Sequence, residues 1–335
     1  MPHLFHRIAA FFALLLMMPM NANAGVVLKM ATLAPEGSVW HKGLMEMGEE
    51  WKTISGGEVE LKIYADGNLG NETVLLRKMR IGQIHGGALT NLGLLEIDRG
   101  PQVINTPMLI RTYPELDYVM ATMGPKFEER IEKNGYIVLS WGDAGWAHLF
   151  TRDPLTNPDD VGKLKIFAWE GDPAAVEMYQ KGGFKPVVVS ATDILPSLNS
   201  GLLDSFPSSP VAALGTQWFG LAKNMLDVPW APLMGAVILK KEAWESIPAD
   251  IRPKLLESAR RVSAETQRKV RKHDVKAVEI MKVYGLKVNT VDDATYQRWV
   301  QKAETVYPIV REKIVPTDVF DETKRLVEEH RSQNK

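Results

Sequence analysis

The sequence predicts an α/β fold built on mixed or mostly parallel sheets. Residues 26–32 form an apolar run, residues 39–51 place large apolar side chains at three- and four-residue spacing, and residues 59–63 alternate in polarity. This order of strand, helix and strand continues to residue 90 and is typical of parallel sheets. A polar and apolar pattern from 253 to 282 also predicts one long helix. With 335 residues, the chain can form one large domain or two medium ones.

Turn and capping residues set the expected elements of the first half. A Pro-Glu-Gly-Ser turn at 35–38 opens the helix near Val39, and glycines at 56 and 57 end it. Asn71 is placed to cap a helix that runs to Gly82. A short strand then follows over residues 86–89, with Thr90 and Asn91 at its tip.

The second half continues the alternation. We expect a strand over 183–189, a helix over 191–200, a strand and loop over 201–209, a returning segment over 228–239, a strand over 284–288 and an amphipathic helix over 294–330. Pro229 and Pro232 make the returning segment irregular, as a crossing between two domains would be.

Composition excludes several classes of function. The formal net charge of −1 gives no overall field that would attract nucleic acid or an anionic membrane. The chain has no cysteine, which excludes disulfides, thiolate zinc sites and a cysteine nucleophile. The histidines show no metal-ligand spacing, and there is no nucleophile elbow or phosphate loop. We therefore expect no enzyme activity, no cofactor and no metal.

The N-terminus resembles an export signal. His3, His6 and Arg7 precede a short apolar core, and Ala22-Asn23-Ala24 has the small residues of a cleavage site. We expect residues 1–24 to be removed after Ala24, which predicts a periplasmic protein that is not inserted in the membrane.

The stretch from 139 to 173 has the composition of a ligand pocket. Tryptophans 141, 146 and 169 are interleaved there with Asp143, Glu170 and Asp172. Because ligands bind beyond the carboxyl ends of strands in open parallel sheets, the strand tips are the candidate site. These tips are residues 34–38, 90–91, 141–146, 169–172 and 206–210.

Four runs in this order resemble the periplasmic solute-binding proteins of tripartite ATP-independent periplasmic (TRAP) transporters, dicarboxylate-binding type. They are GNLGNETVLLRKMRIGQIHGG, INTPMLIRTYPE, NPDDVGKLKI and LPSLNSGLLDSFPSSP. The resemblance implies a two-lobed clamshell with a long helix bridging the lobes, and a small-molecule solute delivered to TRAP-type membrane permease subunits. It divides the chain into a first lobe over 25–145, a second lobe over 146–229, a return to the first lobe over 230–262, and bridging and C-terminal helices over 263–335.

The chain departs from that family where the family binds carboxylates. Phe167 stands where members usually carry an arginine, Ala147 where a second arginine is common, and Ser208 near a common asparagine. A carboxylate buried in a closed cleft needs a paired cation or several donors. We therefore expect a solute with an apolar or aromatic body rather than a simple dicarboxylate, with Lys165 and Arg152 left as candidate replacement anchors.

Eight residues are the predicted ligand contacts. The aromatic walls are Trp146, Phe167, Trp169 and Phe206, the hydrogen-bonding groups are Asn91 and Ser208, and the groups for polar recognition or lobe latching are Asp143 and Glu170. Two alternatives stay open. The tryptophans and acids could instead form an aromatic cage for a cationic or quaternary ammonium group. The protein could also be a carrier of hydrophobic or lipid-like cargo, or a sensory receptor, without a dedicated permease.

Overall fold

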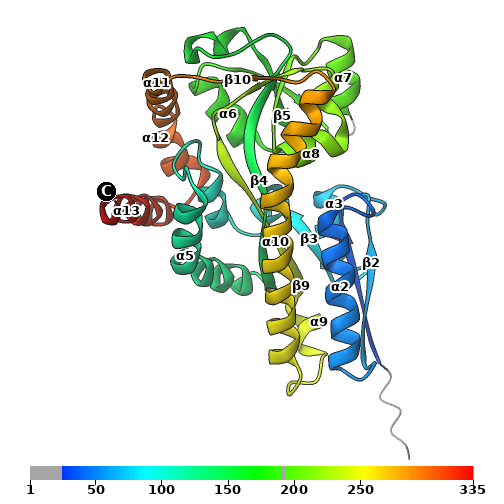
Figure 1. Cartoon of the computed structure of the whole chain (residues 1–335). Helices are drawn as coiled ribbons and strands as arrows, with labels where there is room; N and C mark the ends of the chain where they lie inside the picture. Colours follow the sequence, from blue (N-terminus) through cyan, green and yellow to red (C-terminus); the bar gives the residue numbers. More distant parts are fainter. Residues whose placement is uncertain (1–24, 191–192, 335) are drawn as a thin grey trace, which may run out of the picture.

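Two α/β lobes share two long strands and one long helix in the computed structural model (Figure 1). It describes residues 25–190 and 193–334, so the predicted signal segment 1–24 lies outside the described residues. The strands follow the order β2-β1-β3-β9-β4-β7-β5-β6 across the molecule. The α/β fold class with a bridging helix is confirmed.

The first lobe forms around β1 (Val26–Thr32), which pairs in parallel with β2 (Val59–Tyr64) and β3 (Gly86–Thr90). Its helices begin where the capping residues predict. Ser38 Oγ accepts the His41 N–H at 3.2 Å and starts α2 (Val39–Ile54). Asn71 Oδ1 accepts the Val74 N–H at 3.0 Å and starts α3 (Glu72–Arg80). The expected strands and helices of this region are confirmed.

The two shared strands are antiparallel and run through both lobes. β9 (Ala231–Lys240) pairs with β3 on one side and with β4 (Tyr136–Thr151) on the other. Beyond a break in register between Asp143 and Trp146, β4 continues into the second lobe and pairs with β7 (Ser205–Ser208). The sheets are therefore mixed, because the strands that cross between lobes oppose their neighbours.

The second lobe places β5 (Lys165–Trp169) between β6 (Lys185–Val189) and β7, all in parallel. Its other elements are α6 (Pro173–Lys181), α7 (Ile194–Ser200), α8 (Pro210–Thr216), β8 (Asn224–Leu226) and β10 (Lys287–Asn289), with short 3-10 helices over Pro158–Lys163 and Trp218–Gly220. The helix expected over 191–200 begins at Ile194, and residues 191–192 lie outside the described residues.

Helix α10 (Arg252–Val283) contacts both lobes (Figure 1). It follows the short α9 (Lys241–Glu245). Near its start, the Leu255 carbonyl accepts the Trp51 Nε1–H at 3.0 Å, which ties α10 to the first lobe. Further along, Asp274 Oδ1 accepts the Val211 N–H at 3.0 Å, which ties it to α8 of the second lobe. The long helix predicted over 253–282 is thus confirmed as the bridge.

The C-terminal region is broken into several helices, whereas the sequence predicted one. These are α11 (Asp293–Glu304), α12 (Tyr307–Ile309), a π-helical turn (Val310–Ile314) and α13 (Thr317–Gln333). Pro308 and Pro316 stand at the breaks, because proline cannot continue a helix from the preceding turn.

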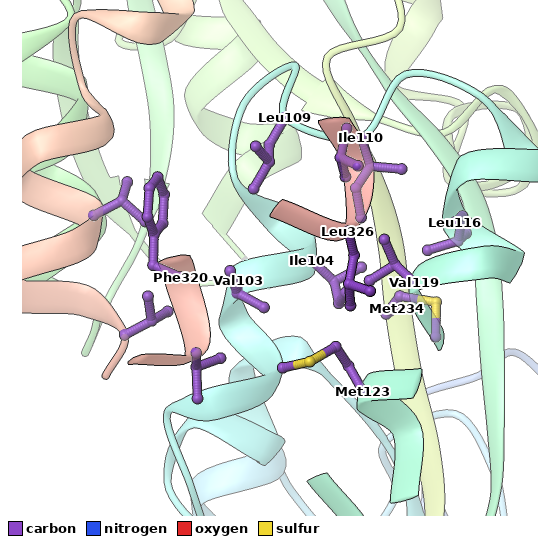
Figure 2. Close-up of a cluster of buried hydrophobic side chains, with 14 of the residues drawn as sticks. Val103, Ile104, Leu109, Ile110, Leu116, Val119, Met123, Met234, Phe320 and Leu326 are labelled. Carbon is purple, nitrogen blue, oxygen red and sulfur yellow. The ribbon is translucent and has the colours of Figure 1, made fainter. Parts of the chain in front are cut away.

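Helix α13 docks on α5 (Tyr113–Lys133) through a buried apolar cluster (Figure 2). Phe320 and Leu326 of α13 belong to the same cluster as Val119 and Met123 of α5 and Val103 and Ile104 of the 3-10 helix Gly100–Asn105. Met234 of β9 also joins it and lines the cavity described below. The short α4 (Asn91–Leu95) lies between β3 and this 3-10 helix in the chain.

Candidate functional site

A cavity of about 490 Å³ lies between the two lobes. Its wall includes the end of β1, the start of α2 and the tip of β3 from the first lobe, and the ends of β5 and β7 from the second. The shared elements β4, β9 and α10 complete it. Such a volume falls in the range of small-molecule sites, so the cavity can hold one small organic solute between lobes.

All five predicted strand tips contribute residues to this cavity, but only four of them are strand ends. Ala34 and Pro35 follow β1, Asn91 follows β3, and Asp172 follows β5. The tip predicted over 206–210 contributes residues 207–209. Residues 142–144 also line the cavity, but they lie in the middle of β4, at its break in register, and the prediction of a strand end there was wrong. Beyond the carboxyl ends of parallel strands the backbone turns away and leaves a crevice, which is the reason the tips converge.

Aromatic rings form much of the wall. The aromatic lining residues are Trp40, Phe167, Trp169, Tyr179, Trp218 and Trp230. Phe167 and Trp169 lie on the same face of β5, since they are two residues apart, and they meet edge to face, with ring centroids 4.7 Å apart. Such rings bury a large apolar area against a ligand, and their faces also attract cations.

Five of the eight predicted contacts line the cavity. They are Asn91, Asp143, Phe167, Trp169 and Ser208. The three positions at which we expected a departure from the carboxylate-binding pattern, Ala147, Phe167 and Ser208, are also in the wall.

The structure places the other three predicted contacts outside the wall. Trp146 is buried and packs edge to face on Tyr113 at 5.6 Å, in the cluster beneath α13. Phe206 is fully buried and stacks on Phe150 at 5.1 Å in the core of the second lobe. Glu170 is exposed at the tip of β5. The break in register in β4 explains why Trp146 lies outside the wall. Such a break changes which face of the sheet the following side chains point to, so simple alternation along the strand misplaces them.

No lysine, arginine or histidine lines the cavity in the part of the chain that the structure describes. The two candidate replacement anchors are held elsewhere. Arg152 donates to the Leu198 carbonyl, and Lys165 Nζ donates to the Gly201 carbonyl at 3.2 Å. A ligand carboxylate would therefore meet no cationic side chain in this wall.

Three acidic residues belong to the wall instead: Glu72, Asp143 and Asp172. The side chain of Asp143 has no exposed surface, so its carboxylate does not face the cavity. Glu72 accepts hydrogen bonds from the N–H and Oγ1–H of Thr90 and from the Gly93 N–H. Burial raises its pKa, and these donors act against that rise. Asp172 caps α6 by accepting the Ala175 N–H at 3.0 Å, and burial raises its pKa as well. Both groups thus already have partners within the protein.

Asp143 differs, because its main partner is a cation. Oδ2 accepts from Arg271 Nε at 2.9 Å. Oδ1 is buried and has no hydrogen-bond partner among residues 25–190 and 193–334. Burial raises the pKa of Asp143, against the opposing effects of Arg271 and the Gly145 N–H.

Asp274 of α10 bonds to β4 and to α8 of the second lobe. Its Oδ1 accepts from Val211 N–H at 3.0 Å and its Oδ2 from Trp146 N–H at 3.4 Å, so it joins α10, α8 and β4. Gly145 has φ of +89°, and a Cβ there would lie 2.3 Å from Asp274 Oδ2. Glycine is therefore required where β4 passes this carboxylate.

Several lining residues were not predicted. Trp40, Trp230 and Asn105 lie in the wall, as do Trp218 and Gln267. Trp40 shares the helical spacing of the α2 core residues, so no sequence signal separates it from them. Trp230 lies between Pro229 and Pro232, and these prolines were the available signal for a crossing near the site.

The described residues contain no cluster of histidine and acidic side chains arranged to hold a metal ion. The lining supplies apolar surface, hydroxyls, amides and carboxylates, and this set can bind a solute through packing and hydrogen bonds.

Comparisons with known proteins agree on one family. The family model for bacterial extracellular solute-binding proteins of family 7 matches residues 30–313. The C4-dicarboxylate-binding periplasmic protein DctP of Rhodobacter capsulatus is 25% identical over 265 residues, covering 78% of each chain. The 2,3-diketo-L-gulonate-binding periplasmic protein YiaO of Escherichia coli is 22% identical over 242 residues, covering 70% of this chain and 72% of YiaO.

Solved structures share the fold at low identity. A TRAP periplasmic solute-binding protein from Ralstonia eutropha with bound (S)-2-acetolactate has a TM-score of 0.83 at 20% identity, covering 91% of this chain and 99% of that one. A second, from Sulfurospirillum deleyianum with bound succinate, has a TM-score of 0.81 at 17% identity, covering 90% of this chain and 98% of that one.

Proposed function

Because the chain belongs to the bacterial extracellular solute-binding proteins of family 7, we propose that it is the periplasmic substrate-binding subunit of a TRAP-type transporter. The family is one of solute-binding proteins rather than enzymes. In this proposal residues 1–24 direct export and are removed after Ala24. The mature protein captures one small solute and delivers it to membrane permease subunits.

The observation that carries the proposal is the cavity between the lobes. Residues from both lobes form its wall, so a bound solute contacts both at once. A solute that contacts both lobes favours the closed arrangement over any open one, since it gains the full set of contacts only there. Among the described residues, no helix is both long and apolar enough to span a bilayer.

The proposed solute has an apolar or aromatic body and is not a dicarboxylate. The relatives with named ligands carry organic acids such as succinate, so the comparisons give this part no support. It rests on the wall itself, with six aromatic lining residues and no basic one in the described part of the chain. A buried carboxylate without a paired cation is strongly unfavourable, whereas aromatic walls favour apolar surface.

A thermal-shift screen tests the proposal. The purified mature protein is heated with aromatic acids, apolar amines, quaternary amines and short dicarboxylates in turn. A solute at a hundred times its dissociation constant adds about 2.7 kcal/mol to the free energy of unfolding, which such a screen detects.

Trp169→Ala is the test variant, and Trp244→Ala, in the first-lobe core away from the cavity, is the control. We expect an apolar solute to stabilise the protein and Trp169→Ala to abolish that effect. A tight dicarboxylate would refute the apolar solute while leaving the transport role intact. No stabilisation by any class would count against solute capture in this cavity.

A further inference from the structure

The inference concerns the charge of the solute and rests on the proposed function. Five half-buried lining residues carry side-chain polar groups that make no hydrogen bond within the described residues. These groups are the amide of Asn91, Thr266 Oγ1, Gln267 Oε1, and the Nε1–H of Trp169 and of Trp218. None of them belongs to the fully buried atoms without partners, so each keeps accessible surface. All five groups are uncharged.

The acidic residues of the wall already have their charge stabilised by the protein. Glu72 is buried and accepts three hydrogen bonds from the corner between β3 and α4. The carboxylate of Asp143 has no exposed surface and pairs with Arg271. Asp172 is half-buried, and it caps α6 by accepting the Ala175 N–H, at a helix N-terminus that favours negative charge.

A charged solute of either sign therefore lacks a free counter-charge in this wall. No basic side chain lines the cavity within residues 25–190 and 193–334, so an anion has no cation to pair with. A cation meets Asp172 alone, whose charge is already used in capping α6. Moving an unpaired charge out of water costs far more than moving a hydroxyl or an amide, which recovers hydrogen bonds from the wall.

Helix α10 supplies the polar group whose orientation is best fixed. Gln267 Nε2 donates to the Trp141 carbonyl at 3.4 Å, which leaves Oε1 as an acceptor without a partner. Ser263, one turn earlier on α10, donates to the same carbonyl at 2.6 Å and holds this part of the helix against β4. Because its amide is held in place before the solute arrives, Gln267 loses little freedom on binding.

From these groups we propose that the solute is uncharged, with an aromatic or apolar body against Phe167 and Trp169 and a hydroxyl or amide group that donates to Gln267 Oε1. Hydroxyls and primary amides both donate and accept, so they also suit the indole N–H groups and the amide of Asn91. The solute then contacts the bridging helix α10 directly, in addition to the two lobes.

Matched probes that differ in charge test this proposal on the wild-type protein. One series is indole-3-ethanol, indole-3-acetamide, tryptamine and indole-3-acetate, and a smaller-ring series is 2-phenylethanol, phenylacetamide, phenethylamine and phenylacetate. Calorimetry at neutral pH measures each dissociation constant. We expect the alcohol and the amide of each series to bind at least about tenfold more tightly than the amine and the acid, because the charged probes lose their hydration without gaining a free counter-charge.

Gln267→Met tests the acceptor, and Gln301→Met, at an exposed position of α11 away from the cavity, is its matched control. We expect Gln267→Met to weaken indole-3-ethanol about fivefold and to leave 3-ethylindole, which has no hydroxyl, unchanged. Gln301→Met is expected to change neither. Equal losses for the two probes in Gln267→Met would show that Gln267 does not bond the hydroxyl. If Gln267→Met does not fold, the wild-type series still decides the charge of the solute.

Failure of this proposal and failure of the proposed function are distinguishable. An amine that binds best would point to attraction between a cation and the rings, and an acid that binds best would point to an anion site. Either result would overturn the uncharged solute while leaving the transport role in place, and failure of every probe would overturn the uncharged aromatic class. The thermal-shift screen, extended by these alcohols and amides, tests solute capture itself, and no stabilisation by any compound in it would count against the proposed function.

Discussion

Arg271 joins helix α10 to Asp143 on β4 through a hydrogen bond of 2.9 Å from Nε to Oδ2. The same guanidinium donates to Asp117 on α5 and lies over the Tyr113 ring, 4.0 Å from its centroid. The side chain of Asp143 has no exposed surface, so Arg271 is the main group that offsets its buried charge. One arginine thus ties three elements together directly behind the cavity wall.

Replacing Arg271 by methionine is expected to lower the free energy of unfolding by about 3 kcal/mol or more, since it leaves a buried carboxylate without its partner. Urea unfolding measures the change. Arg298→Met is the control, because the pair of Arg298 with Asp159 is exposed and worth at most about 1 kcal/mol. Equal losses in the free energy of unfolding for the two substitutions would show that the pair of Arg271 with Asp143 stabilises the protein no more than an exposed ion pair does.

Trp146→Ala is expected to cost about 3–5 kcal/mol of stability, because the ring is buried against Tyr113 in the cluster beneath α13. Trp169→Ala is expected to cost much less, since Trp169 is only partly buried and lines the cavity. Thermal unfolding of the two variants without solute compares them. A larger loss of stability in Trp169→Ala than in Trp146→Ala would contradict the placement of Trp146 in the buried cluster and of Trp169 in the cavity wall.

Phe320→Ala is expected to loosen α13 from α5, because Phe320 is almost fully buried in the cluster shown in Figure 2. The cost is about 3–5 kcal/mol, and limited proteolysis should cut the variant within α13 before the rest of the chain. Val275→Ala on α10 is the control, as that side chain is 69% exposed. Unchanged resistance of α13 in Phe320→Ala would show that this cluster does not hold the helix.

Asp274 predicts a pH dependence of stability. Burial raises its pKa from 3.8 to about 6 in the folded protein. Below pH 3.8 the group is protonated in both states, and between these values the folded state alone holds the proton. The contribution of Asp274 to stability is therefore fully present below pH 3.8. It is lost as pH rises through 6, and the loss is about 3 kcal/mol in all.

The measurement is the difference in free energy of unfolding between the wild-type protein and Asp274→Asn at pH values from 3.5 to 7. We expect the wild-type protein to lose stability relative to the variant over this interval, because asparagine does not titrate. A constant difference would mean that Asp274 titrates alike in the folded and unfolded states.

Much of the fold followed from local patterns in the sequence. Ser38 and Asn71 mark the starts of α2 and α3 because their side chains bond the first free N–H groups of each helix. The pattern from 253 to 282 predicted α10 because an amphipathic helix has a fixed period. Pairing between distant strands, such as β9 with β3 and β4, has no such local signal, and the mixed sheet order depends on it.

The site was predicted only in part, for related physical reasons. Strand ends located Asn91, Trp169 and Ser208, because the carboxyl ends of the strands lead into the crevice. The position of Trp146 depends on a break in register, and that of Phe206 on stacking with Phe150 across β4 and β7. Both are tertiary effects. Arg271, distant from Asp143 in sequence, was likewise outside the reach of any spacing argument.

Mass spectrometry of the protein purified from the periplasm under native conditions tests the central claim most directly, because a solute bound between the lobes is released on denaturation and can be identified. We expect one small molecule per chain with an apolar or aromatic body, released at lower yield from Trp169→Ala. A dicarboxylate or sugar acid bound at the same stoichiometry would contradict it.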